Sequence, residues 1–518
     1  MPRLISLSGY LAISSTLAAQ APAPPPNLDR YVQQIMADFA VPGVSLAIVK
    51  DGKVVVARGY GVRTLGRPEP VDAHTLFGIA SNTKAFTATA LGILVEEGKL
   101  KWDAPVISYL PWFRLSDPYV TTQMTVRDLL VHRSGLGLGA GDLLWWPTST
   151  YNRKEIAQRL QYIPLSTSFR SAYAYDNVLY LIAGELIESV SGQSWEDFVR
   201  SRILERVGMT ESNVRHSDAA TGGNVATTHA RVDGTVRVIK PFDSDNTNPA
   251  GGINSNATDM AKWLIVQLDS GAVAGGTRLF QPRTTRQLWS IVTPIPPGGV
   301  PPELAPLKAD FQGYALGFFV RDYRGKKLIT HTGGLPGYIS RVAMIPELRL
   351  GVALLTNHES EAMEPIVFRV LDHYLGVEYD WRTAWRTISA RGDSMNAAAE
   401  HEASAARDSM RGPSLPLARY AGTYTDPWYG DVVLALSGGK LTLQFSHTPS
   451  LLGDLEHWQY DTFLVRWRDR ELRADAYITF ALNPDGSIER ARMAPASPSV
   501  DFSFDFQDLS LTPKPPLP

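Results

Sequence analysis

The sequence predicts an α+β domain followed by a small all-β barrel domain. Strand-like apolar runs stand at both ends of the first segment, residues 28–385, and helical runs fill its middle. This order indicates an antiparallel sheet flanked by helices, plus a mainly helical subdomain. Residues 415–512 instead alternate apolar and polar side chains between turn residues, which is typical of a small barrel. Residues 386–414, where Ala, Ser, Glu and Arg dominate, are predicted to form a helical linker.

The N-terminal residues have the pattern of a signal peptide, which we place at residues 1–21. Arg3 precedes an apolar stretch, residues 4–17, and small residues follow. We expect cleavage near Ala18 or Ala19 and a periplasmic or secreted protein, with a short N-terminal anchor as the alternative. No other segment approaches the roughly 18 apolar residues of a membrane span, so no stable span is expected after cleavage.

The elements of the first domain follow from periodicity and turn residues. Asp51 and Gly52 form the dipeptide expected in a tight hairpin. The predicted elements are a helix at 28–39, hairpin strands at 44–49 and 54–60, strands at 338–345 and 350–356 joined by a turn at 346–349, and a helix at 361–375. Both ends of the domain therefore contribute to one sheet, and the active site is expected between the sheet and the helical part.

Composition excludes several classes of function. A net charge of −2 and a pI near 6.6 leave no basic patch or tail, so nucleic acid is not an expected partner. The 518 residues include no cysteine, so disulfides and metal–thiolate sites are excluded. We expect no metal and no cofactor.

The first chemical signal is Ser81-Asn82-Thr83-Lys84, where a strand-like run at 75–80 gives way to a helical run. Residues i and i+3 share one face of a helix, so Lys84 can reach the Ser81 hydroxyl and act as a neighbouring base. The same spacing recurs at Ser437 and Lys440, but Ser-Gly-Gly-Lys between two alternating runs predicts a hairpin turn. The second copy is therefore interpreted as fortuitous.

Two later motifs complete a set suited to acyl transfer. Tyr175 and Asn177 open a helical stretch at 178–190, and His331-Thr332-Gly333-Gly334 ends a strand-like run at 327–330. Tyr175 is a credible base only if a cation such as Lys84 lowers its pKa, and Asn177 can hold Lys84 and a substrate carbonyl. Gly334 has no Cβ, so its backbone N–H is open to close approach. Whether Lys84 or Tyr175 takes the first proton is left open.

This set resembles the serine β-lactamase and penicillin-binding-protein-like superfamily, whose pattern is Ser-x-x-Lys, Tyr-x-Asn and then Lys or His followed by Thr-Gly. Further phrases carry the resemblance over about residues 30–385, such as "LLVHRSGL" at 129–136 and "PAGGINSNATDMAKWL" at 249–264. The resemblance implies a β-lactamase/transpeptidase-like fold and an oxyanion hole made by the N–H groups of Ser81 and Gly334. His132, within the first phrase, is interpreted as structural.

The expected function is an exported serine hydrolase that forms an acyl-enzyme on Ser81. Its substrates would be small esters or short or D-amino-acid peptides, so a carboxylesterase or peptidase leads. A class C-type β-lactamase, a penicillin-binding module with slow deacylation and a catalytically idle scaffold are the alternatives. His331 stands where a Lys would supply a fixed cation for a carboxylate, and this weakens the β-lactam interpretation. The oligomeric state is not predicted.

The C-terminal segment resembles the lipocalin-like β-domain that often follows this superfamily. Four of its aromatic and histidine side chains either line a ligand cavity or fill the barrel core: Trp428, Tyr429, His457 and Trp458. No catalytic role is assigned to this domain.

Overall fold

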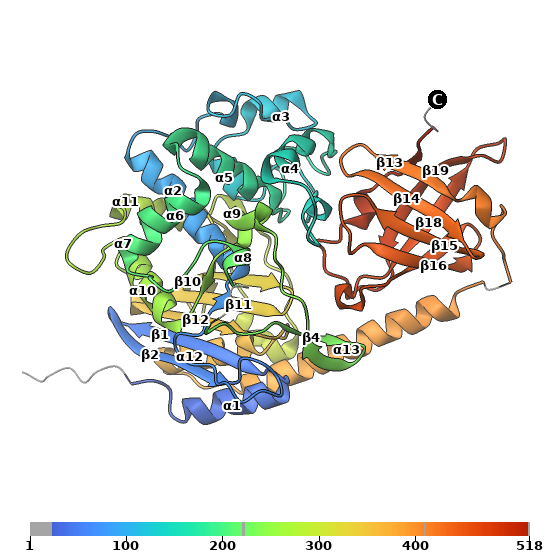
Figure 1. Ribbon diagram of the computed structural model, residues 1–518. Helices are drawn as coiled ribbons and strands as arrows, with labels where there is room; N and C mark the ends of the chain where they lie inside the picture. Colours follow the sequence, from blue (N-terminus) through green and yellow to red (C-terminus); the bar gives the residue numbers. More distant parts are fainter. Residues whose placement is uncertain (1–22, 220–222, 409, 516–518) are drawn as a thin grey trace, which may run out of the picture.

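The structure is a computed structural model that describes residues 23–219, 223–408 and 410–515, so the predicted signal peptide lies outside the described residues. The first domain and the β-domain lie side by side, and a long helix runs from one to the other (Figure 1). Each domain contains one sheet of eight strands within the described residues. No helix in these ranges is long and apolar enough to cross a membrane.

The helices and strands of the first domain occupy the following ranges. Its helices are α1 Leu28–Asp38, α2 Thr83–Glu96, α3 Pro118–Gln123, α4 Arg153–Arg159, α5 Val178–Ser191, α6 Trp195–Val199, α7 Glu205–Val207, α8 His216–Ala219, α9 Asn248–Gly251, α10 Ala257–Leu268, α11 Pro282–Leu288 and α12 Met363–Leu375. Its strands are β1 Gly43–Lys50, β2 Lys53–Gly61, β3 Phe77–Gly78, β4 His229–Val232, β5 Thr235–Val238, β6 Asn254–Ser255, β7 Thr293–Pro294, β8 Gln312–Tyr314, β9 Phe319–Tyr323, β10 Lys326–Leu335, β11 Tyr338–Ile345 and β12 Leu350–Thr356.

The sheet of the first domain is built from both ends of the domain, as predicted. Its strand order is β2-β1-β12-β11-β10-β9-β8-β7, and β1 pairs antiparallel with β12. Asp51 and Gly52 have φ of 53° and 73°, the left-handed pair that a tight hairpin between β1 and β2 requires. The predicted α+β fold with an antiparallel sheet and a helical subdomain is therefore confirmed.

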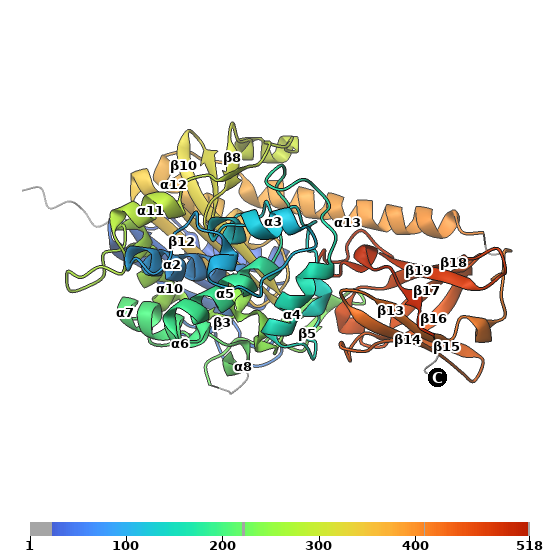
Figure 2. The same ribbon diagram turned by 90° about the horizontal axis from the view of Figure 1, so that it is seen from above.

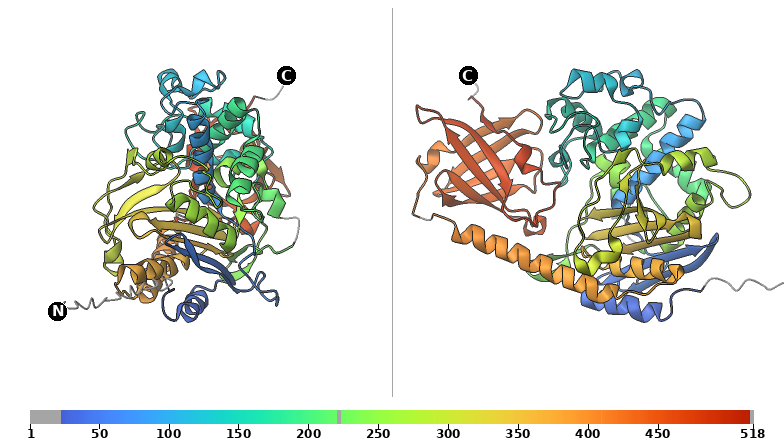
Figure 3. Two further views of the ribbon diagram at one scale, coloured as in Figure 1. Left: turned by 90° about the vertical axis from the view of Figure 1, so that its left-hand side faces the viewer. Right: turned by 180° about the vertical axis from the view of Figure 1, so that it is seen from behind.

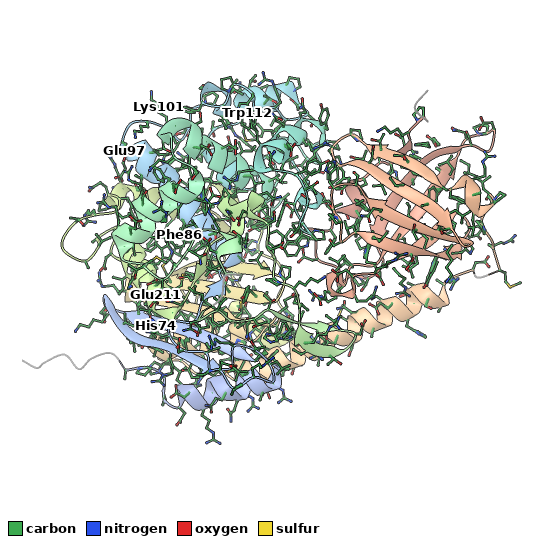
Figure 4. The ribbon with its side chains drawn as sticks, viewed as in Figure 1. His74, Phe86, Glu97, Lys101, Trp112 and Glu211 are labelled. Carbon is green, nitrogen blue, oxygen red and sulfur yellow. The ribbon has the colours of Figure 1, made fainter. Side chains whose placement is uncertain are left out.

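Helices cover both faces of this sheet (Figure 3). Side chains of β1 alternate between them: Leu46 and Ile48 pack with α1 and α12, whereas Ala47 and Val49 belong to the core that contains α2 and α10. Figure 4 shows Phe86 of α2 in the interior, where it stacks on Trp263 of α10 at 3.8 Å between ring centroids. The core that contains α2 and α10 continues through the helical subdomain, so this subdomain and the sheet share one hydrophobic core.

The linker region forms the helix α13, Trp381–Ala405, which extends beside the β-domain (Figure 2). It begins before the predicted residue 386. The Asp380 carboxylate accepts a hydrogen bond from Thr383 N at 3.0 Å and so caps the first turn, and Trp381 is fully buried against α12. Because of these contacts, α13 begins one turn before the residue at which the composition of the chain changes.

The β-domain is a nearly closed antiparallel barrel. Its strands are β13 Gly422–Asp426, β14 Gly430–Ser437, β15 Lys440–Phe445, β16 Leu452–Gln459, β17 Thr462–Trp467, β18 Ala476–Leu482, β19 Ile488–Pro495 and β20 Thr512–Pro513. They follow the order β19-β18-β17-β16-β15-β14-β13-β20, and Ala491 pairs with Leu511 across the remaining gap. Gly438 and Gly439 form the turn between Ser437 and Lys440, both exposed, so the second Ser-x-x-Lys is a hairpin.

The four side chains singled out in the β-domain do not act together. Trp428 and Tyr429 are buried in the core that joins the two domains, and Tyr429 packs edge-on against Phe445. Trp458 is half-buried and lies beneath the guanidinium of Arg407, at 4.8 Å from its ring centre. The barrel-core interpretation therefore holds for Trp428 and Tyr429.

Candidate active site

Ser81 lies in a tight turn held against the sheet. The turn is the 3-10 helix Ala80–Asn82 between β3 and α2, and Ala80 adopts a left-handed φ of 49°, a strained conformation for a residue with a side chain. A Cβ on Gly333 would lie 2.4 Å from the carbonyl oxygen of Ile79 and 2.9 Å from the Cβ of Ala80. Glycine at 333 therefore lets β10 pass directly behind the turn that presents Ser81.

Gly334, unlike Gly333, is not closely packed by the protein. A Cβ on Gly334 would meet only the Ile339 Cδ1 atom, at 3.5 Å, which is an ordinary contact. The close packing of the protein itself therefore concerns Gly333, and the expected close approach of a substrate to the Gly334 N–H stays a prediction. Gly334 still lines the same pocket as Ser81, and its place in the oxyanion hole stays a prediction.

Lys84 is fully buried and aimed at Ser81. Its Nζ donates to Ser81 Oγ at 3.0 Å, to Asn177 Oδ1 at 2.8 Å and to the Ala250 carbonyl at 3.1 Å. Burial lowers the pKa of Lys84 to about 7, although the carboxyls of Asp142 and Asp176 oppose the effect. An amine with this pKa is neutral in a large fraction of molecules near pH 7, so it can accept a proton from Ser81.

Tyr175 lies close to both Lys84 and Ser81. Its ring centre is 5.0 Å from Lys84 Nζ, and its hydroxyl shares a hydrogen bond with Ser81. Burial raises the pKa of Tyr175 well above its usual value, and the hydrogen bond with Ser81 only partly opposes this. The phenol therefore keeps its proton at neutral pH, which suits a donor better than a first base.

His331 faces the same pocket as a neutral ring. It is buried, and its Nε2 lies 2.8 Å from the hydroxyl of Tyr314. Burial, together with the charge of Lys84, lowers the pKa of His331 to about 3, while a hydrogen bond with the Thr332 backbone opposes the shift. This position consequently offers no cation to a substrate carboxylate, as the sequence argument anticipated.

His132 contributes more to the site than its sequence position suggested. Its ring packs against Tyr175 at 4.2 Å and Tyr314 at 4.4 Å between centroids, and its Nδ1 accepts from the backbone N–H of Asp176 at 3.2 Å. Burial lowers the pKa of His132 well below its usual value, so the ring is neutral. The interpretation as a structural residue agrees with this packing, and the structure adds that it supports Tyr175.

A buried carboxylate that the sequence did not reveal extends the hydrogen-bond chain. Asp142 accepts from Asn177 Nδ2 at 2.8 Å and from Trp145 Nε1 at 2.9 Å, while Asn177 holds Lys84 with its amide oxygen. Burial raises the pKa of Asp142 to about 7, and the hydrogen bonds from Asn177, Ser503 and Trp145 oppose the rise. Several donors converge on Asp142, so the contacts are those of a carboxylate.

The β-domain, to which the sequence assigned no catalytic role, contributes side chains to this hydrogen-bond network. Ser503 donates its hydroxyl hydrogen to Asp142 Oδ2 at 2.8 Å. Asp505 is buried and accepts the backbone N–H groups of Gly141 and Leu143, at 2.7 and 3.0 Å. Two β-domain side chains thereby fix the loop that carries Asp142. The Phe502 ring also lies 6.2 Å from that of Tyr175.

These residues surround one pocket of about 370 Å³. The predicted residues Ser81, Tyr175, Asn177, His331, Thr332, Gly333 and Gly334 all line it, and Lys84 lies directly behind Ser81. The structure thus brings every predicted site residue together. Among the described residues, no group of three or more His, Asp or Glu side chains is placed to hold a metal ion.

Comparison with known proteins agrees with this geometry. The profile of the Beta-lactamase family matches residues 28–373, and that of a domain of unknown function, DUF3471, matches residues 406–513. "Unguisins hydrolase ungD" of Aspergillus violaceofuscus is 28% identical over 89% of this chain and 86% of its own length.

Two solved structures share the fold. An octameric penicillin-binding protein homologue from Pyrococcus abyssi has a TM-score of 0.60 and 22% identity, covering 94% of this chain and 99% of its own. D-amino acid amidase from Ochrobactrum anthropi SV3 has a TM-score of 0.54 and 24% identity, covering 67% of this chain and 99% of its own. With a family profile that spans two thirds of its length and the Ser-x-x-Lys, Tyr-x-Asn and His-Thr-Gly motifs in one pocket, the chain belongs to the Beta-lactamase family of serine hydrolases.

Proposed function

We propose that the protein is an exported enzyme that hydrolyses small amide or ester substrates through an acyl-enzyme on Ser81. The observation that carries the proposal is the contact between Lys84 Nζ and Ser81 Oγ, at 3.0 Å. The amine is buried and its pKa is lowered to about 7, so the serine has a base beside it at neutral pH. The export part rests on the sequence of residues 1–21.

The geometry supports a division of labour between Lys84 and Tyr175. Neutral Lys84 takes the hydroxyl proton of Ser81 while Oγ attacks the substrate carbonyl carbon, and the N–H groups of Ser81 and Gly334 stabilise the oxyanion. Tyr175, which keeps its proton, passes it to the departing nitrogen or oxygen and is recharged by the Lys84 ammonium. Water then attacks the acyl-enzyme, the protons return by the same path, and Ser81 is released with a carboxylic acid product.

The substrate class follows from the charge of the pocket and from the relatives. Neutral His331 supplies no cation, which favours neutral ester and amide substrates over carboxylated β-lactams. The Aspergillus relative that matches most of the chain is a hydrolase by name, and a protein that shares the fold is a D-amino acid amidase. The first name supports a hydrolytic reaction, and the second supports an amide of an amino acid or short peptide as the leading substrate.

Covalent labelling tests the nucleophile. We expect a fluorophosphonate to modify the Ser81 peptide and Ser81→Ala to abolish both labelling and turnover of p-nitrophenyl esters and aminoacyl p-nitroanilides. Ser437→Ala is the matched control, because the same Ser-x-x-Lys spacing there forms an exposed hairpin, and it should change neither readout. An adduct mapped by mass spectrometry to any other residue would overturn the proposal.

A further inference from the structure

A second cavity opens beside the pocket that contains Ser81. It measures about 500 Å³ and lies between the first domain and the β-domain. Trp146, Gly334, Leu335 and Asp501 line both spaces, so the cavity continues from the predicted oxyanion hole. The two spaces therefore adjoin along these four residues.

The inner wall of this cavity is aromatic and apolar. Trp146 stacks on Phe242 with 5.6 Å between ring centroids, and Phe504 of the β-domain meets Trp146 edge-on at 6.5 Å. Ile239 and Leu335 add buried aliphatic surface. Aromatic walls between domains are typical of sites for the apolar part of a small ligand.

The rim carries an excess of negative charge. Its charged side chains are Asp243, Glu359, Asp469, Glu471, Asp501, Lys240 and Arg473. Arg473 makes a bidentate pair with Glu359, at 2.7 and 2.8 Å, and Lys240 lies 3.4 Å from Asp469. These pairs leave a net negative rim, which favours a neutral or cationic ligand over an anionic one.

The chemistry of the neighbouring pocket decides which part of the substrate enters. The leaving group must lie next to the proton on Tyr175, because it departs with that proton. The acyl portion is then the part that can extend past Gly334 and Leu335. We propose that the interdomain cavity is the acyl subsite of the enzyme, which binds an aromatic acyl extension that is neutral or basic; this inference rests on the proposed function of Ser81.

Matched p-nitrophenyl esters test the subsite. Acetyl, 4-phenylbutyryl, 4-(4-aminomethylphenyl)butyryl and 4-(4-carboxyphenyl)butyryl esters share one leaving group and differ only in the acyl portion. One methylene in an apolar pocket changes kcat/KM by about tenfold or more, so we expect phenylbutyryl to exceed acetyl by at least about tenfold. The aminomethyl ester should exceed the carboxy ester, because the rim repels the carboxylate.

A variant in which a Trp side chain fills the cavity tests the same subsite from the side of the enzyme. Ser450 lines the cavity on the β-domain side, and Ser450→Trp should remove most of the phenylbutyryl advantage while acetyl turnover persists. Ser437→Trp, in the remote hairpin turn, is the control and should keep the advantage. Pro449→Trp, also on the cavity wall, serves as a second filling variant if Ser450→Trp does not fold.

The outcomes separate the two proposals. Turnover of the acetyl ester with no gain from the phenyl extension, or a gain that both filling variants retain, overturns the subsite and leaves the function of Ser81 standing. Preference for the carboxy ester overturns the proposed ligand charge. Absence of turnover with every ester and p-nitroanilide overturns the proposed function, and the subsite with it.

Discussion

Replacing Asp142 by Asn gives a sharp test of the hydrogen-bond chain behind Ser81. Lys84 Nζ lies 2.8 Å from Asn177 Oδ1, and Asn177 Nδ2 lies 2.8 Å from Asp142 Oδ2. The amide spans about 2.3 Å between its oxygen and nitrogen, so the two charges are at most about 8 Å apart. At an effective dielectric constant of about 20, charges at that distance interact by about 2 kcal/mol.

The direction of the effect follows from the sign of the removed charge. The Asp142 carboxylate raises the pKa of Lys84 and thus opposes the desolvation that lowers it. Without that charge, Lys84 stays neutral to lower pH. Since 1.36 kcal/mol corresponds to tenfold in a proton equilibrium, about 2 kcal/mol corresponds to about thirtyfold. We therefore expect the acid limb of kcat/KM, near pH 7 in the native enzyme, to move down by about 1.5 pH units in Asp142→Asn.

The assay is kcat/KM for a p-nitrophenyl ester between pH 4 and 9, corrected for the pH dependence of p-nitrophenolate absorbance. Asp372→Asn is the matched control, because Asp372 is also buried and also accepts an indole N–H, from Trp381 at 2.9 Å, but does not contact the network of Lys84. Its acid limb should stay in place. An acid limb that stays fixed or moves to higher pH in Asp142→Asn would refute the reasoning.

Three further predictions concern neighbouring groups. Lys84→Ala and Tyr175→Phe should each lower kcat by about 10²–10⁴-fold, and the double variant should lose far less than the product, because the two share one proton path. A short p-nitrophenyl ester should exceed nitrocefin in kcat/KM by at least about tenfold, and His331→Lys should narrow this ratio by supplying a cation for the carboxylate. Ser503→Ala removes one donor to Asp142 and should raise the pKa of that carboxyl, which weakens its negative charge at neutral pH and moves the acid limb of kcat/KM down, in the same direction as Asp142→Asn but by less. Steady-state kinetics with melting temperatures as a folding check measure all three, and multiplicative losses, an unchanged ratio or an acid limb that moves to higher pH would contradict them in turn.

How far sequence predicted the site depends on the distance along the chain between its members. Ser81 and Lys84 are three residues apart on a helical turn, so local geometry alone predicts their contact. Tyr175 and His331 lie far along the chain, and only the combination of motifs predicts that they converge on Ser81. Asp142 begins a short 3-10 helix, Asp142–Leu144, that no periodic pattern marks in the sequence, and its partner Ser503 is 361 residues away, so no local signal connects them.

The fold shows the same dependence on local pattern. The predicted strands at 338–345 and 350–356 have the bounds of β11 and β12, because apolar residues dominate both runs and the polar turn at 346–349 separates them. The predicted strand at 327–330 is short, because β10 continues to Leu335 through a glycine pair that has little intrinsic strand preference. Pairing of Gly333 with Ser340 holds that extension in place, and this tertiary contact is what positions the pocket wall.

The β-domain is better understood as part of the active site than as an appendage. The D-amino acid amidase structure covers 67% of this chain and 99% of its own, so a fold of this kind exists at about two thirds of the length of this chain. In this chain, however, Asp505 replaces solvent as the acceptor for two loop N–H groups, and Ser503 completes the shell around Asp142. Buried donors that lose such acceptors cost about 1–3 kcal/mol each. The docked barrel therefore stabilises the segment that orients Asn177, and this links the surroundings of the Lys84 amine to a domain that begins more than 300 residues later.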